Sequence, residues 1–289
     1  MNHCFLIEAH NNPDLLSRTI KKLDADNHDF IIHLDLKSDI SVFPQFPNAH
    51  YLTEEEGRVN VQWGGYSQIV AELNMMSFAI KSRRCYDYFH LLSGSDYPCV
   101  NQIVFDKFFE DKRGCSFMHF DSEAEIFNWR DSKYNDRVAK WYLHDVQWIP
   151  SRLKSIVSRL LNIMVKRKPI PDVVAGWNWF SWHRSLVNWV LDYLGRNPSY
   201  LKRFKYTTCC DEVIFHTLLY RRIEELNIEP YNSLRYIDWH PNRPYASLPL
   251  ILDERDFLSI VNSKALFCRK VDEKLSKRLM DLLDKNMGE

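Results

Sequence analysis

Two pairs of adjacent charged residues in the second half of the chain have the types and spacing that acid–base and phosphate chemistry needs. Asp211 and Glu212 precede a helix predicted over 213–226, where a rigid backbone can hold a carboxylate as a general base toward a hydroxyl group. Arg269 and Lys270 follow an apolar stretch, and a guanidinium beside an ammonium can bind phosphate oxygens. The structural alternatives are that the acidic pair complements a helix dipole and that the basic pair is a solvated helix edge.

Acidic residues also follow two predicted strands. Asp35 comes directly after a strand over 30–34 and precedes Lys37, a pattern that suits a contact to a ribose or a uracil. Asp96 comes after a strand over 86–92. Because parallel sheets bind ligands at the carboxyl ends of their strands, both carboxylates are candidate ligand contacts. The alternative for Asp35 is that it only forms the turn after its strand.

The scaffold that must position these residues is predicted from the alternation of strand-like and helix-like segments. Apolar strands are expected over 4–9, 30–34 and 86–92, with helices over 15–23 and from Ser67 to 80 between them. This order favours a parallel sheet with right-handed crossovers. After a polar and then basic stretch, the same rhythm resumes at Gly176. The predicted fold class is therefore α/β, with a central, mainly parallel sheet flanked by helices.

Several common enzyme signatures are absent from the sequence. The chain has 8 Gly and contains neither GxGxxG nor GxxxxGK[ST], which argues against P-loop and Rossmann cofactor sites, and it has no GxSxG nucleophile elbow. No Asp-x-Asp follows the strand over 86–92; Asp24 and Asp26 have that spacing but follow a helix. The 7 Cys show no repeated spacing and no CxxC lies beside a His cluster, so free thiols are expected and a structural zinc site is not.

Composition excludes further classes. Formal charge is balanced, with 38 basic and 38 acidic residues, which argues against wholesale nucleic-acid binding. No stretch approaches the ~20 apolar residues that span a bilayer, and the apolar start of the chain is too short for a signal peptide. Aromatic residues make up 14% of the chain, and their rings could either stack on sugars or fill a core.

Six sequence elements, in one order, resemble those of the core-2/I-branching N-acetylglucosaminyltransferases and protein xylosyltransferases, which form glycosyltransferase family 14. No single element is specific, but six in the same order from residue 33 to residue 270 form a strong pattern. The elements are HLDLKS at 33–38, VQWGGYS at 61–67, FHLLSGSDYP at 89–98, WNWFS at 177–181, CDE at 210–212 and LFCRK at 266–270.

The resemblance implies a GT-A-like fold, a UDP-sugar donor and inverting transfer without a metal ion or other cofactor. It makes Glu212 the general base that deprotonates an acceptor hydroxyl. Lys270 and an upstream arginine, assigned as Arg243, would replace the metal at the departing diphosphate, with Arg269 beside them. The other residues predicted on the donor side are His10, Asp35 and Asp96.

The resemblance also suggests an acceptor side. Trp239 and Trp179 are the predicted aromatic contacts to the acceptor sugar, although Trp239 could instead be a core residue. The predicted polar contacts are Glu123, Glu125 and Arg130. Within a single domain over 1–289, we expect a nucleotide-sugar-binding half at 1–120, an acceptor- or membrane-facing insert at 121–175, and a catalytic, diphosphate-binding half at 176–289.

The resulting hypothesis is a transferase that moves N-acetylglucosamine or xylose from UDP onto a glycan hydroxyl during surface polysaccharide synthesis. One alternative is a glycoside hydrolase using Asp211 and Glu212, but adjacent residues of a helix point about 100° apart and flank one bond poorly. The other is a non-catalytic glycan-binding protein that retains the fold. The sequence does not decide the donor sugar or the acceptor.

The segment 151–168 carries a separate signal. Apolar residues recur there at helical spacing, and no Asp or Glu occurs between Asp145 and Asp172. Together with Trp148, this pattern predicts a basic amphipathic helix on anionic lipid, near a lipid-linked acceptor. A cytoplasmic protein, peripheral at the inner face of the membrane, is the expected location. The alternative is an ordinary helix packed on the core. The stripe consists of Leu153, Ile156, Val157, Leu160, Leu161 and Met164.

Overall fold

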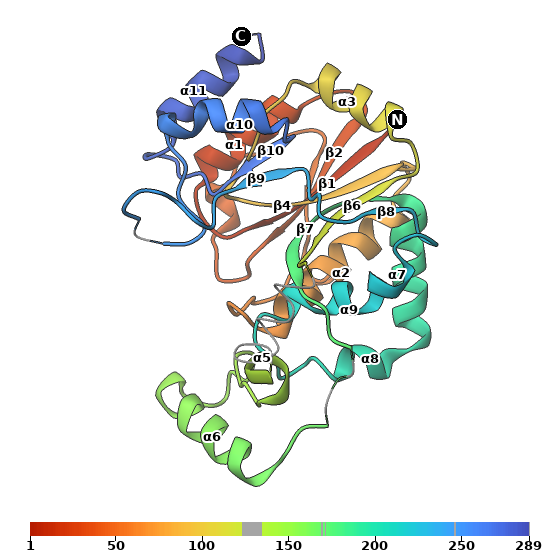
Figure 1. Ribbon diagram of the computed structural model, residues 1–289, viewed down its shortest axis with the longest axis vertical. Coiled ribbons are helices and arrows are strands. Elements are labelled where there is room, and N and C mark those ends of the chain that lie inside the picture. The colour runs from red at the N-terminus through yellow and green to blue at the C-terminus, as the bar shows by residue number, and fades with distance from the viewer. Residues whose placement is uncertain (123–134, 169, 171, 246, 289) are drawn as a thin grey trace.

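The computed structural model describes residues 1–122, 135–168, 170, 172–245 and 247–288, and its centre is a seven-stranded sheet of order β3-β2-β1-β4-β7-β6-β8 (Figure 1). The strands β3, β2, β1 and β4 run parallel, and β7 runs antiparallel to both of its neighbours, β4 and β6. This confirms the predicted α/β class with a mainly parallel central sheet. The strands are β1 (His3–Ala9), β2 (His28–Leu34), β3 (Ala49–Tyr51), β4 (Tyr88–Ser93), β6 (Ser116–Phe120), β7 (Gly176–His183) and β8 (Ile228–Glu229).

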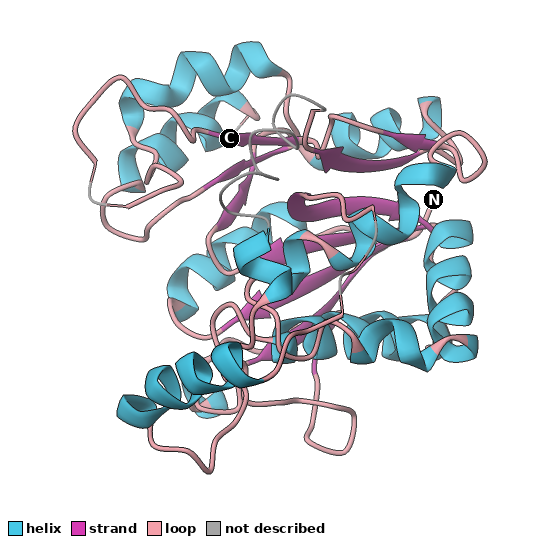
Figure 2. Cartoon of the chain, turned by 60° about the horizontal axis from the view of Figure 1, so that its bottom comes forward, coloured by secondary structure: helices cyan, strands magenta, loops and turns pink. Residues whose placement is uncertain are grey.

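Helices cover both faces of this sheet (Figures 1 and 2). On one face, α1 (Pro13–Leu23) and α3 (Gln102–Asp111) bury residues such as Ile20 and Phe105 against Phe5. On the other face, α2 (Tyr66–Lys81), α7 (Arg184–Arg196) and α9 (Ile214–Leu219) pack around Leu6 and Phe180. The short helix α8 (Pro198–Lys202) follows α7. Burial of both sheet faces explains why the central strands read as continuous apolar runs.

A second, three-stranded sheet packs on the face of the central sheet that α1 and α3 cover, where Phe267 contacts Phe5. Its Arg269 end reaches Ser93 at the carboxyl end of β4. Its order is β5-β10-β9, formed by β5 (Asp96–Pro98), β10 (Phe267–Arg269) and β9 (Arg235–Ile237). The helices α10 (Phe257–Ser263) and α11 (Lys277–Asn286) pack beside it around Leu252 and Met280. The pairing of β10 with β5 places Arg269 directly opposite Asp96.

The structure corrects the helix predicted over 213–226. Cys210–Glu212 is a 3-10 turn (η3), α9 covers only Ile214–Leu219, and Tyr220–Arg222 is again 3-10 (η4). Val213 has φ −132°, outside the helical range, so the turn and the helix cannot merge. Two further 3-10 turns are η1 (Ile40–Val42) and η5 (Glu254–Asp256).

The segment after α5 (Asn135–Ala139) carries the predicted amphipathic helix, α6, which spans Ser151–Met164 and ends four residues before the predicted boundary. It lies at the far end of the molecule from the second sheet (Figure 1), and none of its residues is buried. The apolar stripe is therefore not part of the core. Among the described residues, no helix has the length and apolarity needed to cross a membrane.

Candidate active site

Three carboxyl groups, each with at least one buried oxygen, meet where β1, α2 and η3 converge. Glu8 lies near the end of β1, Glu72 projects from α2, and Asp211 belongs to η3. The Glu72 Oε1 atom accepts a hydrogen bond from Asn178 Nδ2 at 2.8 Å, and Gln68 Nε2 lies 3.4 Å from Glu8 Oε2. One oxygen of each carboxyl group is buried without a hydrogen-bond partner in the described part of the chain. Such a group is costly in its charged form.

The cluster therefore retains protons near neutral pH. Burial, reinforced by the charge of Asp211, raises the pKa of Glu8 to about 8. Burial and the neighbouring Glu8 also raise the pKa of Glu72 well above its ordinary value. For Asp211, burial and then the charge of Glu212 raise the pKa to about 7. Carboxyl groups with such pKa values are typical of sites that handle protons.

Glu212 lies at the rim of this cluster, with its side chain 30% exposed. The carboxylate forms an ion pair with Arg137 of α5, which holds it in one orientation. The neighbouring backbone is fixed by the loop over 61–65: Cys209 donates its N–H to the Gly64 carbonyl at 2.8 Å. Gly64 has φ +68°, which favours glycine, and a Cβ on Gly65 would lie 2.5 Å from Asp145 Oδ1. Gly64 thus allows this loop to approach the turn that carries Glu212, and Gly65 allows it to approach Asp145.

Arg269 forms the cationic side of the site. Its guanidinium donates to Asp96 Oδ2 at 2.9 Å and to Ser93 Oγ at 3.0 Å, and its Cζ lies 3.9 Å from the centre of the Trp179 ring. The charge of Arg269 also lowers the pKa of Glu8, opposing the effect of burial. The predicted residues Asp96, Trp179 and Arg269 are therefore in direct contact, beside the carboxyl cluster.

The predicted nucleoside contacts lie at the ends of the first two strands. Asp35 is buried after β2, and its carboxylate accepts the backbone N–H of Lys37 at 2.8 Å and lies 3.1 Å from Lys37 Nζ. His10 is exposed just after β1, and its carbonyl accepts the hydroxyl of Ser38 at 2.7 Å. The two predicted residues thus belong to one edge of the sheet, although Asp35 already has local partners.

Arg243 has partners that the sequence did not predict. Its guanidinium binds both oxygens of Asp256, at 2.9 and 2.6 Å, and lies 3.3 Å from Asp253. The guanidinium of Arg243 is thus paired with two carboxylates, while the backbone of Lys270 pairs with Leu250 and Leu252.

The acceptor-side predictions are only partly visible. Trp239 is half-buried, and its Nε1 is a buried donor without a partner in the described residues. Glu123, Glu125 and Arg130 lie outside the described residues.

Sequence reasoning missed several functional candidates. Glu8 and Glu72 are charged residues inside apolar patterns, β1 and the inward face of α2, and that interruption is the signal that could have identified them. The partner of Glu212, Arg137, lies in a segment without a recognisable motif. Trp63 is 85% exposed on the loop that contacts Cys209, which is unusual for an indole side chain.

Comparison with known proteins identifies the family of the chain. The family model "Core-2/I-Branching enzyme" matches residues 4–261, nearly the whole α/β domain. The chain belongs to this family. The family match confirms the resemblance, and its range includes five of the six sequence elements, all but LFCRK at 266–270.

Named relatives are distant. The chain is 26% identical over 304 residues to the β-glucuronosyltransferase GlcAT14A of Arabidopsis thaliana, covering 94% of this chain and 62% of the relative. It is 23% identical to the Arabidopsis β-glucuronosyltransferase GlcAT14B, covering 89% of this chain and 59% of that protein. It is 24% identical to the xylosyltransferase oxt of Drosophila pseudoobscura pseudoobscura, covering 77% of this chain and 24% of that protein. The chain thus spans about three-fifths of the length of each plant relative and about a quarter of the length of the Drosophila relative.

Proposed function

We propose that this protein is an inverting, metal-independent glycosyltransferase that moves a sugar from a UDP-sugar onto a hydroxyl of a glycan. The observation that carries the proposal is the contact of Arg269 with Asp96, Ser93 and Trp179, beside a proton-holding carboxyl cluster and Glu212. Family membership and the glycosyltransferase names of the relatives support the same reaction class.

In the proposed reaction the acceptor oxygen attacks the anomeric carbon as the bond to the UDP oxygen breaks. Glu212 takes the hydroxyl proton, and Arg137 keeps the carboxylate oriented before the acceptor binds. Lys270 and Arg269 stabilise the negative charge that develops on the diphosphate. Attack from the face opposite the leaving group inverts the configuration at the anomeric carbon.

The non-catalytic alternative is weakened by the same geometry. A glycan-binding protein has no need for buried carboxyl groups whose pKa values lie near neutrality, and such groups reduce stability. A hydrolase using Asp211 and Glu212 is disfavoured because Asp211 is buried whereas Glu212 is on the rim.

The test is UDP release from a panel of UDP-sugars, with and without glycan acceptors. The panel should include the N-acetylglucosamine, xylose and glucuronic acid donors, since relatives are named for the last two. A transferase gives acceptor-dependent UDP release and, by NMR, a product of inverted anomeric configuration. Binding of glycans without UDP release from any donor would favour the non-catalytic alternative, and retention of configuration would contradict the mechanism.

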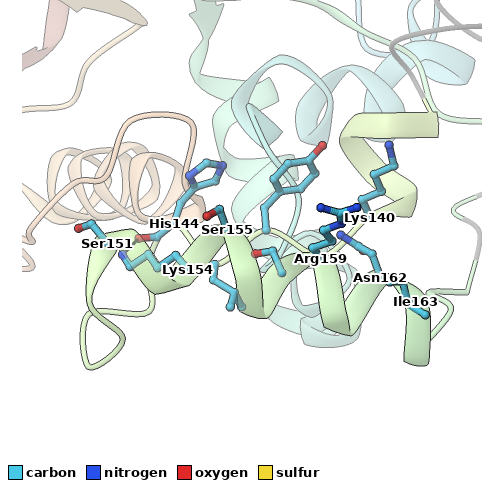
Figure 3. A pocket seen from close by; sticks show the side chains of 11 residues that line it. Lys140, His144, Ser151, Lys154, Ser155, Arg159, Asn162 and Ile163 are labelled. Atoms are coloured by element: carbon cyan, nitrogen blue, oxygen red, sulfur yellow. Dashed lines mark hydrogen bonds between the residues drawn. The ribbon is translucent and has the colours of Figure 1, made fainter.

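We further propose that α6 holds the site beside a lipid-linked acceptor at an anionic membrane. Its polar residues face a hollow of about 850 Å³ under the helix (Figure 3), where Lys154 Nζ donates to the His144 carbonyl at 2.9 Å. Its apolar residues are on the surface: Ile156 is 55% exposed and Met164 is 78% exposed. A helix with its apolar side outward and Lys or Arg around it has the pattern of an interfacial membrane helix.

A further inference from the structure

Three histidines and one aspartate meet at the amino ends of the central strands. His3 and His28 begin β1 and β2 and are direct partners in the strand register. His90 in β4 lies beside His3, and Asp106 reaches the group from α3. All three rings are fully buried. Glu8 lies five residues further along β1, ~17 Å away at ~3.3 Å per residue, so this group is separate from the candidate active site.

The ligand atoms of His3, His28 and Asp106 lie within 4.8 Å of one another. Asp106 Oδ1 is 2.8 Å from His28 Nε2 and 3.5 Å from His3 Nε2. A tetrahedral Zn²⁺ ion with bonds of ~2.1 Å sets its ligand atoms ~3.4 Å apart. To hold the ion, the distance from Asp106 Oδ1 to His28 Nε2 would increase by roughly 0.6 Å, and the distance from Asp106 Oδ1 to His3 Nε2 already fits.

The protons of His28 point to a cation at this place. Its Nδ1 lies 2.6 Å from the carbonyl oxygen of Leu23, which can only accept, so this nitrogen carries the hydrogen. In the neutral ring Nε2 then has a lone pair, and it faces a carboxylate oxygen of Asp106 at 2.8 Å. Two acceptors at this distance require a proton or a metal ion between them.

His3 supplies an independent observation. Its ring is 0% exposed, and its Nε2 has no hydrogen-bond partner among the described residues although it is aimed at Asp106. The other nitrogen, Nδ1, lies 3.0 Å from His90 Nε2, and His90 Nδ1 lies 3.0 Å from Ser181 Oγ. When His3 Nδ1 donates its hydrogen to His90 Nε2 and His90 Nδ1 donates to Ser181 Oγ, a lone pair remains on His3 Nε2.

We propose that His3, His28 and Asp106 bind one Zn²⁺ ion that ties α3 to the first two strands. Two imidazole nitrogens and a carboxylate are common zinc ligands, and a water can complete the tetrahedron because the Asp106 side chain is 29% exposed. The outer partners also match: each ligand histidine can donate its second N–H, and Asp106 Oδ2 accepts from Asn27 Nδ2 at 2.9 Å. The ion has no part in sugar transfer and goes beyond the proposed function. The proposal replaces the expectation, drawn from the cysteine spacing, that the chain has no structural zinc site.

The test uses the full chain without an affinity tag, carrying Cys85→Ser so that an exposed thiol does not bind zinc. Metal content is measured by elemental analysis, and the metal-free protein is titrated with Zn²⁺ while the thermal midpoint and the zinc affinity are recorded. Asp106→Asn removes the anionic ligand but keeps a similar shape. Asp111→Asn, exposed at the end of the same helix, is the matched control.

We expect one zinc per chain, a higher thermal midpoint with Zn²⁺ but not with Mg²⁺, and at least ~10-fold weaker zinc affinity in Asp106→Asn alone. Co²⁺ added to the metal-free parent protein should give tetrahedral d–d absorption, a measurement that does not depend on any variant folding. The proposal fails if Zn²⁺ leaves the midpoint unchanged, if zinc binds equally to Asp106→Asn, or if Asp106→Asn lowers the midpoint equally with and without Zn²⁺. The last result would make His28 and Asp106 a simple ion pair.

Discussion

Replacement of Glu8 by Gln should stabilise the protein at high pH and change little at low pH. Burial raises the pKa of Glu8 from its ordinary 4.5 to about 8 in the folded state. The protonated side chain thus favours folding below pH 4.5, and this contribution is lost as the pH rises from 4.5 to about 8. Gln resembles the protonated acid at every pH, so it avoids the loss.

The magnitude follows from the difference between the two pKa values. At ~1.4 kcal/mol per pKa unit, a change from 4.5 to about 8 corresponds to roughly 5 kcal/mol, an upper limit because Glu72 and Asp211 compete for the same protons. We therefore expect the free energy of unfolding of Glu8→Gln, relative to wild type, to increase by about 2–4 kcal/mol between pH 5 and pH 9.

Urea unfolding followed by tryptophan fluorescence at the two pH values measures this difference. Glu54→Gln is the matched control, because Glu54 is exposed and its replacement should give the same small effect at both pH values. The free energy of unfolding of Glu8→Gln minus that of wild type could instead be the same at pH 5 and pH 9 within ~0.5 kcal/mol. In that case Glu8 does not hold a proton in the folded protein at neutral pH, and the description of the carboxyl cluster is wrong.

Four further outcomes are expected. Glu212→Gln should reduce turnover at least ~10²-fold with UDP affinity little changed; near-wild-type turnover would exclude Glu212 as the base. Turnover should survive EDTA, and Lys270→Ala should weaken UDP binding in calorimetry, whereas an absolute need for manganese would contradict the cationic mechanism. Trp63→Ala should raise the acceptor KM by several-fold at unchanged donor KM if the exposed ring stacks on sugar; equal effects on both would argue against it. The protein should co-sediment with anionic but not with neutral vesicles. The double variant Ile156→Glu/Met164→Glu should lose this binding, whereas Leu258→Glu, which changes an exposed apolar residue elsewhere, should keep it. Absence of binding at low salt would refute the membrane proposal.

The parts of the fold that the sequence predicted are those with clear apolar patterns. The strands β1, β2 and β4 are buried along nearly their whole length, and the helix α2 buries residues at helical spacing. Their order favours a parallel sheet. The helix after Glu212 was predicted too long. Val213 separates η3 from α9, and the segment 213–226 contains the 3-10 turn η4, which periodicity cannot distinguish from a helix.

The site was harder to predict because its residues are polar groups placed by tertiary contacts. Glu212 follows from its motif, but its ion pair with Arg137 depends on a segment with no regular pattern. Arg243 was predicted at the diphosphate, yet Asp253 and Asp256 lie 10 and 13 residues further along the chain and bind its guanidinium. Sequence spacing did not reveal that these two carboxylates would bind the guanidinium that had been predicted to bind the diphosphate.

The second sheet explains how short, unpredicted elements determine the chemistry of the site. Its three strands contain three residues each, too few for any alternation to be recognised. Their pairing nevertheless brings Arg269 opposite Asp96, which is 173 residues away in the sequence. Asp96 in turn holds the N–H and hydroxyl of Ser93 at 2.6 Å, so the end of β4 and the end of β10 form one hydrogen-bonded unit. A cation fixed in this way is already oriented before the donor binds, which is the condition under which it can stabilise a departing diphosphate without a metal ion.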